Sequence, residues 1–387
     1  MDTQKLDQTY IANTYARFPV TIVKGKGSLV WDDTGKEYID LSTGIAVDIF
    51  GVADEEWMAA VTKQLGTLQH ISNLYYTEPC VKLAQMLCEK TGMKKVFFGN
   101  SGAEANECAI KAARKWSEEK KGKDYSTIIT LKNSFHGRTI TTLAATGQDV
   151  FHHDFTPLTE GFVYAEPNDL ADLEQLIKAN KCAAVMMEVV QGEGGVMPLD
   201  EAYVKGAAKL CEQYDLLLIC DEVQVGNGRS GKLYGYMHYG VQPDIVSTAK
   251  GLAGGLPLGA TLLGEKVQDV LSAGTHGSTF GGNPVCCAGA INVLSRLDEK
   301  MLEGVEERSA YIKQELAGAK GVLGVSGLGL KLGIQTEKNA SDIIAACREK
   351  GVLVIKAKDK LRLLPALNIP MEQLQKAVAV IKACCAE

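Results

Sequence analysis

The chain has 387 residues, of which 46% are hydrophobic and 23% are charged, and its formal net charge is −6 at pH 7. These values are ordinary for a soluble globular protein, and the negative charge argues against non-specific binding to nucleic acid. The length exceeds what one hydrophobic core usually supports, so we expect two domains.

The first 30 residues hold several charges and no apolar run of signal-peptide length, and no apolar stretch approaches the length of a membrane span. The chain contains eleven cysteines. Four of them form two adjacent pairs, Cys286-Cys287 and Cys384-Cys385, and no CxxC pair occurs. Neither arrangement suits a tetrahedral metal site or an ordinary disulfide. We therefore expect reduced, mostly buried cysteines, no metal site and a cytoplasmic protein.

The first predicted element in chain order is a hairpin. A strand over residues 28–32 is followed by the turn Asp33-Thr34-Gly35-Lys36 and a second strand over 37–41. We expect residues 1–50 to lie outside the central sheet and to pack with a smaller domain.

A strand over residues 96–98 leads through Gly99-Asn100-Ser101-Gly102-Ala103 into a helix over 103–119. Ser101, Gly102 and Ala103 at such a helix start present free backbone N–H groups, and the helix dipole adds partial positive charge. The segment suits an anion such as phosphate. A plain serine cap with Glu104 in a capping box explains it equally well.

The next strand, 127–131, precedes Ser134-Phe135-His136-Gly137-Arg138-Thr139. Phe135 could cover one face of a flat cofactor, and Arg138 could bind a substrate carboxylate with two hydrogen bonds. His136 is a weaker candidate for a direct catalytic role.

A strand over residues 183–188 and a helix over 202–214 come before a buried strand, 216–220, that ends at Asp221. A carboxylate there lies at the carboxyl edge of the sheet, where ligands bind in open α/β folds. A helix cap or a metal-binding acid would explain Asp221 alone. Residues 226–232 match most of a P-loop, but Leu233 stands where serine or threonine must bind Mg²⁺, which argues against a nucleotide triphosphatase.

The strand 244–248 is followed by Lys250 and Gly251. Alone, Lys250 would most simply be a surface lysine. Paired with Asp221, 29 residues upstream, it supplies an amine that can form an imine, while the acid keeps a pyridine nitrogen protonated so that the ring withdraws electrons. Together they indicate a phosphorylated pyridine cofactor, with residues 99–106 holding the phosphate.

Apolar strands that alternate with helices predict a mostly parallel sheet covered on both faces, an α/β architecture. From residue 282 the pattern changes to one long helical region over 291–316 interrupted at Gly304, strands over 327–334 and 352–354, and a helix over 371–386. We therefore expect a large cofactor-binding domain over 51–281 and a smaller α+β domain over 282–387.

Taken in order, these motifs resemble those of class III (fold type I) pyridoxal-phosphate-dependent aminotransferases, from residues 13–19 to 362–365. The resemblance implies that Lys250 binds pyridoxal 5′-phosphate and moves the proton, and that Asp221 pairs with its ring nitrogen. It also implies a set of further cofactor contacts: Ser101, Gly102 and Ala103 at the phosphate, Phe135 on the ring, Gln224 beside the ring hydroxyl, and Glu222 and Val223 next to them.

The resemblance also implies a homodimer with shared active sites. The run from His276 to Pro284 would reach into the neighbouring subunit, where Thr279 contacts the phosphate and Ser278 the substrate. Arg138 would bind the substrate carboxylate distal to the cofactor, with Tyr15 nearby. Arg362 would bind the second carboxylate of 2-oxoglutarate, and Glu193 would pair with Arg362 when the substrate has no such group.

Within the family the resemblance is greatest to acetylornithine aminotransferases, which implies transfer of the terminal amine of N2-acetyl-L-ornithine to 2-oxoglutarate in arginine biosynthesis. Ornithine, succinylornithine, succinyldiaminopimelate and 4-aminobutyrate stay open as donors. A mutase or decarboxylase is a second class, disfavoured by Arg138 and residues 191–193, and a non-catalytic binding protein would be expected to have lost Lys250. The chain departs from the family's Gly-His-x-His-Pro-like pattern over 51–56, at Val189, where proline is common, and at Val225, where threonine is usual.

Overall fold

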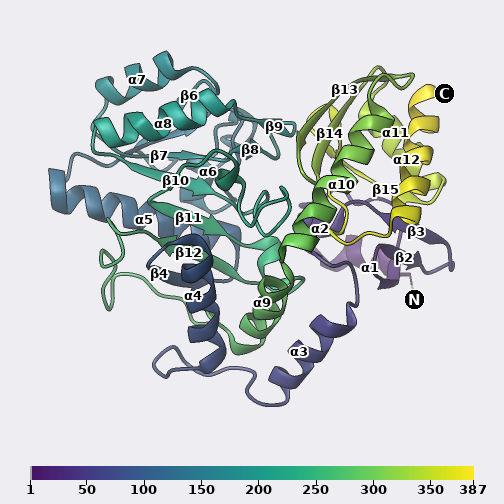
Figure 1. The fold of residues 1–387 in the computed structure, drawn as a ribbon, viewed down its shortest axis with the longest axis horizontal. Helices are drawn as coiled ribbons and strands as arrows, with labels where there is room; N and C mark the ends of the chain where they lie inside the picture. Colours follow the sequence, from purple (N-terminus) through teal and green to yellow (C-terminus); the bar gives the residue numbers. More distant parts are fainter. Residues whose placement is uncertain (1) are drawn as a thin grey trace.

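The computed structural model describes residues 2–387, which form a large domain and a smaller one on either side of α9 (Figure 1). The helices are α1 (Thr3–Tyr10), α2 (Thr43–Ala46), α3 (Glu55–Leu65), α4 (Glu78–Thr91), α5 (Gly102–Lys121), α6 (Ile140–Ala145), η1 (Asp149–Phe151), α7 (Leu170–Ala179), α8 (Glu201–Gln213), η2 (Gly235–His238), η3 (Lys250–Ala253), α9 (Pro284–Arg296), α10 (Glu299–Leu316), α11 (Ala340–Glu349) and α12 (Met371–Ala386). The strands are β1 (Ile22–Lys26), β2 (Leu29–Asp32), β3 (Glu37–Asp40), β4 (Lys95–Gly99), β5 (Thr127–Leu131), β6 (Phe162–Ala165), β7 (Cys182–Met187), β8 (Val190–Gln191), β9 (Met197–Pro198), β10 (Leu217–Asp221), β11 (Ile245–Thr248), β12 (Gly259–Leu263), β13 (Val322–Leu328), β14 (Lys331–Thr336), β15 (Val352–Leu353), β16 (Ile355–Ala357) and β17 (Lys360–Leu363).

The large domain is built on a seven-stranded sheet in the order β4-β12-β11-β10-β7-β5-β6. Its strands run parallel except β12, which is antiparallel to β11 and β4. Alternate residues of β10 enter different cores: Leu218 and Cys220 face the core that contains α7 and α8, whereas Leu217 and Ile219 face the core under α5. Helices thus cover both faces, and the predicted mostly parallel α/β sheet is confirmed.

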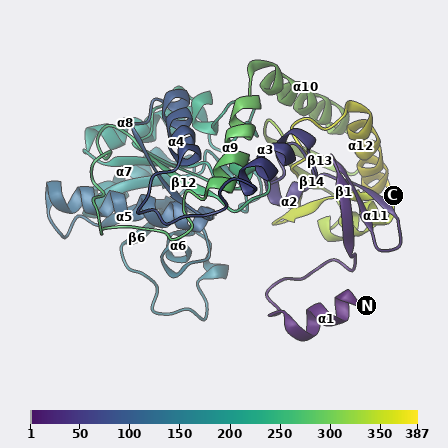
Figure 2. The same ribbon diagram turned by 90° about the horizontal axis from the view of Figure 1, so that it is seen from below.

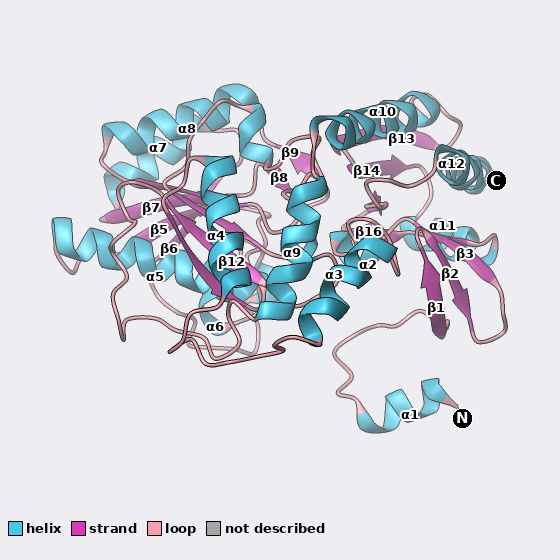
Figure 3. Cartoon of the chain, turned by 60° about the horizontal axis from the view of Figure 1, so that its bottom comes forward, coloured by secondary structure: helices cyan, strands magenta, loops and turns pink. Residues whose placement is uncertain are grey.

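The smaller domain contains the antiparallel sheet β13-β14-β17-β16 together with α10, α11 and α12 (Figure 3). The predicted N-terminal hairpin is present as β2 and β3, and β3 pairs in parallel with β15. The N-terminal strands therefore share a sheet with the C-terminal part of the chain. Helix α1 lies away from the body of the molecule and buries none of its residues (Figure 2).

Two predicted elements were wrong. The helix expected over 291–316 is two helices, α9 and α10, because Asp298 accepts a hydrogen bond from the Met301 amide and begins a new helix, while Gly304 lies inside α10. The strand expected over 327–334 is a hairpin, β13-β14, that turns at Gly329, where φ is +54°. A side chain there would collide with the backbone of Arg229 and Ser230.

The predicted limit at residue 282 stays a prediction: α9 packs against α3 and α4 and then leads into α10. The altered stretch after Gly51 pairs with the N-terminal strands, because Val52 and Gly27 exchange two backbone hydrogen bonds of 2.6 and 2.8 Å. No helix within residues 2–387 is long and apolar enough to cross a membrane.

Candidate active site

A cavity of about 140 Å³ lies at the carboxyl ends of the central strands, beside the start of α5. This is the edge at which ligands bind in open α/β sheets. Its walls come from segments far apart in the sequence: Gly102, Ala103, Asn106, Phe135, His136, Gly137, Glu188, Glu193, Asp221, Val223, Gln224 and Lys250.

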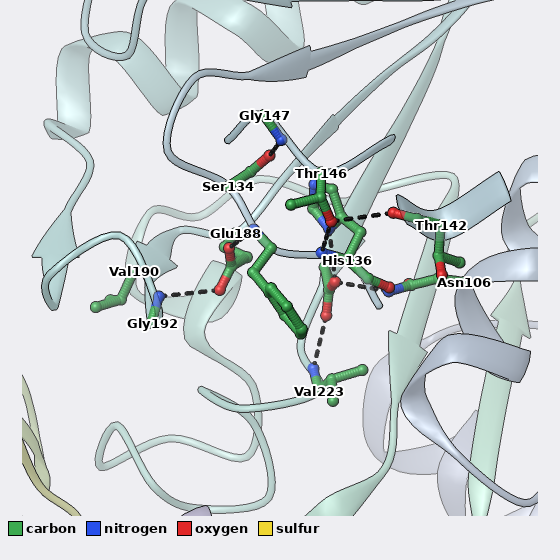
Figure 4. A network of polar contacts seen from close by, with 12 residues as sticks. Asn106, Ser134, His136, Thr142, Thr146, Gly147, Glu188, Val190, Gly192 and Val223 are labelled. Carbon is green, nitrogen blue, oxygen red and sulfur yellow. Dashed lines mark hydrogen bonds and ion pairs between the residues drawn. The ribbon is translucent and has the colours of Figure 1, made fainter. Parts of the chain in front are cut away.

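Asp221, the last residue of β10, is buried and held by three hydrogen bonds. Its three partners, Asn106, His136 and Val223, are labelled in Figure 4. Its Oδ2 accepts from Nδ2 of Asn106 at 2.8 Å and lies 2.7 Å from Nδ1 of His136, and its Oδ1 accepts from the Val223 amide at 3.0 Å. Burial favours the neutral acid, but the hydrogen bonds from His136, Val223 and Asn106 outweigh it and hold the pKa of Asp221 below its usual value. The cavity therefore keeps a carboxylate at its floor.

Lys250 follows β11 with φ of +48°, a left-handed conformation that costs free energy for any residue other than glycine. Its Nζ makes no hydrogen bond or ion pair with other residues of the 2–387 range. Burial lowers the pKa of Lys250, partly offset by Asp221, Glu193 and Glu188. A strained, unpaired amine with a lowered pKa suits nucleophilic chemistry.

The N-terminus of α5 forms another wall. Ser101 caps the helix by accepting from the Glu104 amide at 3.1 Å, and among the described residues the amides of Gly102 and Ala103 have no acceptor. A Cβ added to Gly102 would lie 2.6 Å from Cγ1 of Val223, so this close approach requires glycine. These two amides and the helix dipole can hold an anion.

The loop that carries Phe135 is anchored by Glu188, which follows β7 (Figure 4). Glu188 accepts from the amides of Phe135, at 2.9 Å, and of Gly192, at 3.0 Å. Burial raises the pKa of Glu188. One carboxylate thus joins the aromatic loop to the segment that presents Glu193.

Arg362 of β17, in the smaller domain, pairs with Glu193 of the cavity wall, with 2.5 Å between Nη1 and Oε1. Gln224 lies within 3.5 Å of both side chains. Burial opposes ionisation of Glu193, but Arg362 prevails and the pKa of Glu193 is lowered. Arg362 and Glu193 thus form an ion pair at one side of the cavity.

Arg138 is exposed, and its guanidinium stacks 4.4 Å from the ring centre of Phe151 and 5.4 Å from that of Phe135. It forms no ion pair with any carboxylate of the described chain. Arg138 is therefore a free cation beside the predicted ring-stacking residue.

Seven predicted site residues do not line this cavity. Three of them adjoin residues that do, since Ser101 precedes Gly102, Arg138 stacks beside Phe135 and Arg362 pairs with Glu193. The other four are Tyr15, Ser278, Thr279 and Glu222. Tyr15 is 69% exposed on the N-terminal segment, in a separate hollow. Ser278 and Thr279 line other surface hollows, where Oγ of Ser278 accepts from Asn100 at 3.1 Å. Glu222 points away, because its oxygens accept from the amides of Gly235 and Tyr236 at 2.7 and 2.8 Å, and burial raises its pKa to about 8.

Sequence reasoning missed Asn106 and Glu188 and gave His136 little weight. Glu188 carried the same signal as Asp221, a carboxylate directly after a buried strand. Asn106 carried none, because an asparagine inside a helix is only known to face a carboxylate once the helix is docked on the sheet.

The chain matches the family model for class-III aminotransferases over residues 10–385. It is 49% identical to the acetylornithine aminotransferase of Haemophilus ducreyi over 386 residues, covering 99% of this chain and 98% of that protein. Among solved structures, the ornithine aminotransferase from Toxoplasma gondii ME49 is 33% identical with a TM-score of 0.95, covering 99% of this chain and 94% of that one. The N-acetylornithine aminotransferase from Stenotrophomonas maltophilia K279a is 36% identical with a TM-score of 0.86, covering 99% and 98%.

Proposed function

Because the chain belongs to the class III aminotransferase family, it is a pyridoxal-phosphate-dependent transaminase, and we propose that N2-acetyl-L-ornithine is its amino donor. It would pass the terminal amine to 2-oxoglutarate, giving N-acetylglutamate 5-semialdehyde and L-glutamate. The observation that supports this most is the Glu193–Arg362 pair at the cavity wall, together with the unpaired Arg138 stacked beside Phe135, which lines the same cavity.

The cavity residues fit pyridoxal phosphate. The free amides of Gly102 and Ala103 at the cavity wall would hold the phosphate. Phe135 would cover the ring, Asp221 would face its nitrogen and Gln224 its hydroxyl. When bound, the protonated pyridine ring supplies an electron sink for the carbon that loses a proton.

Two residues of the chain do the proton chemistry in this proposal. Asp221 keeps its negative charge through the hydrogen bonds from Asn106, Val223 and His136, so a proton on a facing ring nitrogen is stabilised. Lys250 would use its Nζ first as nucleophile and then as the base that moves a proton at the substrate carbon.

Charge explains how one cavity would accept two substrates. Acetylornithine has one carboxylate, far from its reacting amine, and Arg138 would bind it while Glu193 neutralises Arg362. 2-Oxoglutarate has a second carboxylate beside the reacting carbon, which would displace Glu193 from Arg362. Such a gate matches an enzyme whose two substrates differ in charge beside the reacting atom.

The site would be completed by a second copy of the chain. Ser278 and Thr279 lie outside the cavity, and apolar side chains near them are exposed, including Leu74, Tyr75 and Phe280, with Tyr76 exposed at 99%. Exposed apolar clusters of this kind mark protein interfaces. In a homodimer Thr279 would contact the partner's phosphate site and Ser278 its substrate. Tyr15 would lie near the pocket in which Arg138 binds the distal carboxylate.

We also propose a cytoplasmic location. All eleven cysteines are free thiols and nine of them are buried, which suits a reducing compartment.

A single-turnover reaction tests the donor. The purified holoenzyme is mixed with acetylornithine, succinylornithine, ornithine or 4-aminobutyrate, and the visible absorbance of the bound cofactor is followed. Acetylornithine should react fastest, and a rate no greater than that of 4-aminobutyrate would refute the donor assignment. Release of CO₂ in place of an aldehyde would indicate a decarboxylase.

A further inference from the structure

Lys331, the first residue of β14, is a buried cation that the proposed reaction does not yet use. Its side chain is 0% exposed, and its Nζ donates to the backbone oxygen of Val190 at 2.7 Å. Within residues 2–387 no carboxylate lies close enough to form an ion pair with it. A buried ammonium without such a partner is costly, so its presence calls for a cause.

The sheet places Lys331 beside Arg362. Arg362 pairs with Gly333, two residues beyond Lys331 on β14, so the two cationic side chains emerge on the same face as diagonal neighbours. The segment from β8 to β9, which contains Glu193, packs on that face: a Cβ on Gly333 would lie 2.8 Å from Cβ of Val196.

The smaller domain holds both ends of this segment. Lys331 binds the oxygen of Val190 at its start, and Oγ of Ser326 donates to the oxygen of Val196 at 2.8 Å at its end. Glu193 lies between these two points, facing Arg362. Lys331 therefore supplies both a tether and a charge, whereas Ser326 supplies a tether alone.

The charges around Arg362 indicate that the charge of Lys331, more than its hydrogen bond to Val190, matters for substrate binding. In the free site Glu193 balances Arg362. When a substrate carboxylate arrives, two anions face one guanidinium unless a second cation is near. Burial lowers the pKa of Lys331 to about 8, with Glu188 acting against the shift, so Lys331 is mostly charged at neutral pH.

We propose that Lys331 is a positioning residue whose charge allows Arg362 to bind the substrate carboxylate next to the reacting carbon while Glu193 stays nearby. It thereby favours the diacid substrate and leaves binding of the monocarboxylate donor unchanged. This inference rests on the proposed function.

Three substitutions separate the effect of the Lys331 charge from the effect of its hydrogen bond to Val190. Lys331→Met removes both, Lys331→Gln keeps a donor for Val190 without the charge, and Lys331→Arg keeps the charge. Ser326→Ala is the matched control, since it removes the other tether and no charge. Binding of glutarate, an unreactive diacid, is measured by calorimetry on each holoenzyme, together with kcat and KM for both substrates.

The Met and Gln variants should raise the glutarate Kd and the KM for 2-oxoglutarate about tenfold. Their kcat and KM in the acetylornithine reaction should stay within about twofold, as should every parameter of Lys331→Arg and Ser326→Ala. If Lys331→Gln binds glutarate like the wild type, or if Ser326→Ala weakens binding as much as Lys331→Met does, the charge is not what acts and the inference is wrong. It is also wrong if both substrates weaken equally.

Failure of the proposed function gives a different result, because the wild type itself would then not react with acetylornithine. Glutarate binding still tests the charge of Lys331 in that case. Should Lys331→Met not fold, the Gln and Arg variants decide.

Discussion

Asp221 shows how a buried acid stays ionised. Three donors from three segments converge on it, so removing one raises its pKa and also leaves a poorly satisfied charge in the core. Because its folded pKa is depressed, its contribution to stability is present above the unfolded pKa and is lost as pH falls through the folded pKa.

Replacement of Asn106 by leucine should therefore move the acid limb of the kcat–pH profile to higher pH and reduce stability by about 1.5–3 kcal/mol. The measurements are kcat against pH and urea unfolding at neutral pH. Ser134→Ala is the control, because Ser134 lies two residues before His136, accepts a hydrogen bond from the Gly147 amide and does not touch Asp221. An acid limb that stays in place in Asn106→Leu would show that this amide does not hold the charge.

Glu193 is a second residue whose charge can be tested by a single substitution. Its replacement by alanine leaves Arg362 without a carboxylate partner, so a donor that presents no carboxylate there should lose affinity while glutamate keeps it. The ratio of kcat/KM for acetylornithine to that for glutamate should fall about tenfold. Glu193→Asp, which keeps the charge, should lose less. Unchanged kinetics for both donors would contradict the gate.

At the scale of elements, the start of α5 lies unusually close to the segment after β10. The contact between Gly102 and Val223 leaves no room for a methyl group, and it brings the free amides to the cavity wall. The position of a whole helix therefore depends on one missing side chain.

Gly102→Ala should displace the helix start and weaken binding of pyridoxal phosphate about tenfold. Titration of the cofactor-free protein, followed by absorbance or tryptophan fluorescence, measures this. Gly324→Ala is the matched control, because a Cβ on this strand glycine meets nothing within 4 Å. Equal cofactor affinity in both variants would mean that the phosphate is held elsewhere.

At the scale of the whole molecule, three predicted site residues lie away from the cavity within a single chain. Ser278, Thr279 and Tyr15 lie outside the cavity, and the surface around Tyr76 is apolar. One chain has a mass of 41.6 kDa, so sedimentation separates a monomer from a dimer of twice that mass.

The wild type should sediment as a dimer, and Tyr76→Asp should shift it toward the monomer with loss of activity, because a charge placed in an apolar interface is costly. Leu323→Asp is the control, since Leu323 is also exposed and apolar but lies on β13 of the smaller domain. A monomeric wild type that is fully active would refute the shared site.

The sequence alone predicted five of the seven central strands, because each of these is an apolar run bounded by turn residues, and it missed β6 and β12. The bounds of β5 and α12 agree with the predicted ranges, while the break before α10 and the turn at Gly329 were missed. Each feature had a local signal in the sequence: Asp298 caps a helix and Gly329 takes a left-handed turn. Both signals were missed because the apolar pattern continues on either side of them.

The sequence by itself determined the α/β class, the two residues Lys250 and Asp221 at the carboxyl edge of the sheet, and the family, because strand ends and glycine-rich turns are local signals. Only the tertiary structure decided that Asn106 and Glu188 support the site, that Glu222 faces away and that Lys331 lies beside Arg362. Such contacts join residues 13 to 115 positions apart, and they depend on strand register and on helix docking, which no local pattern encodes.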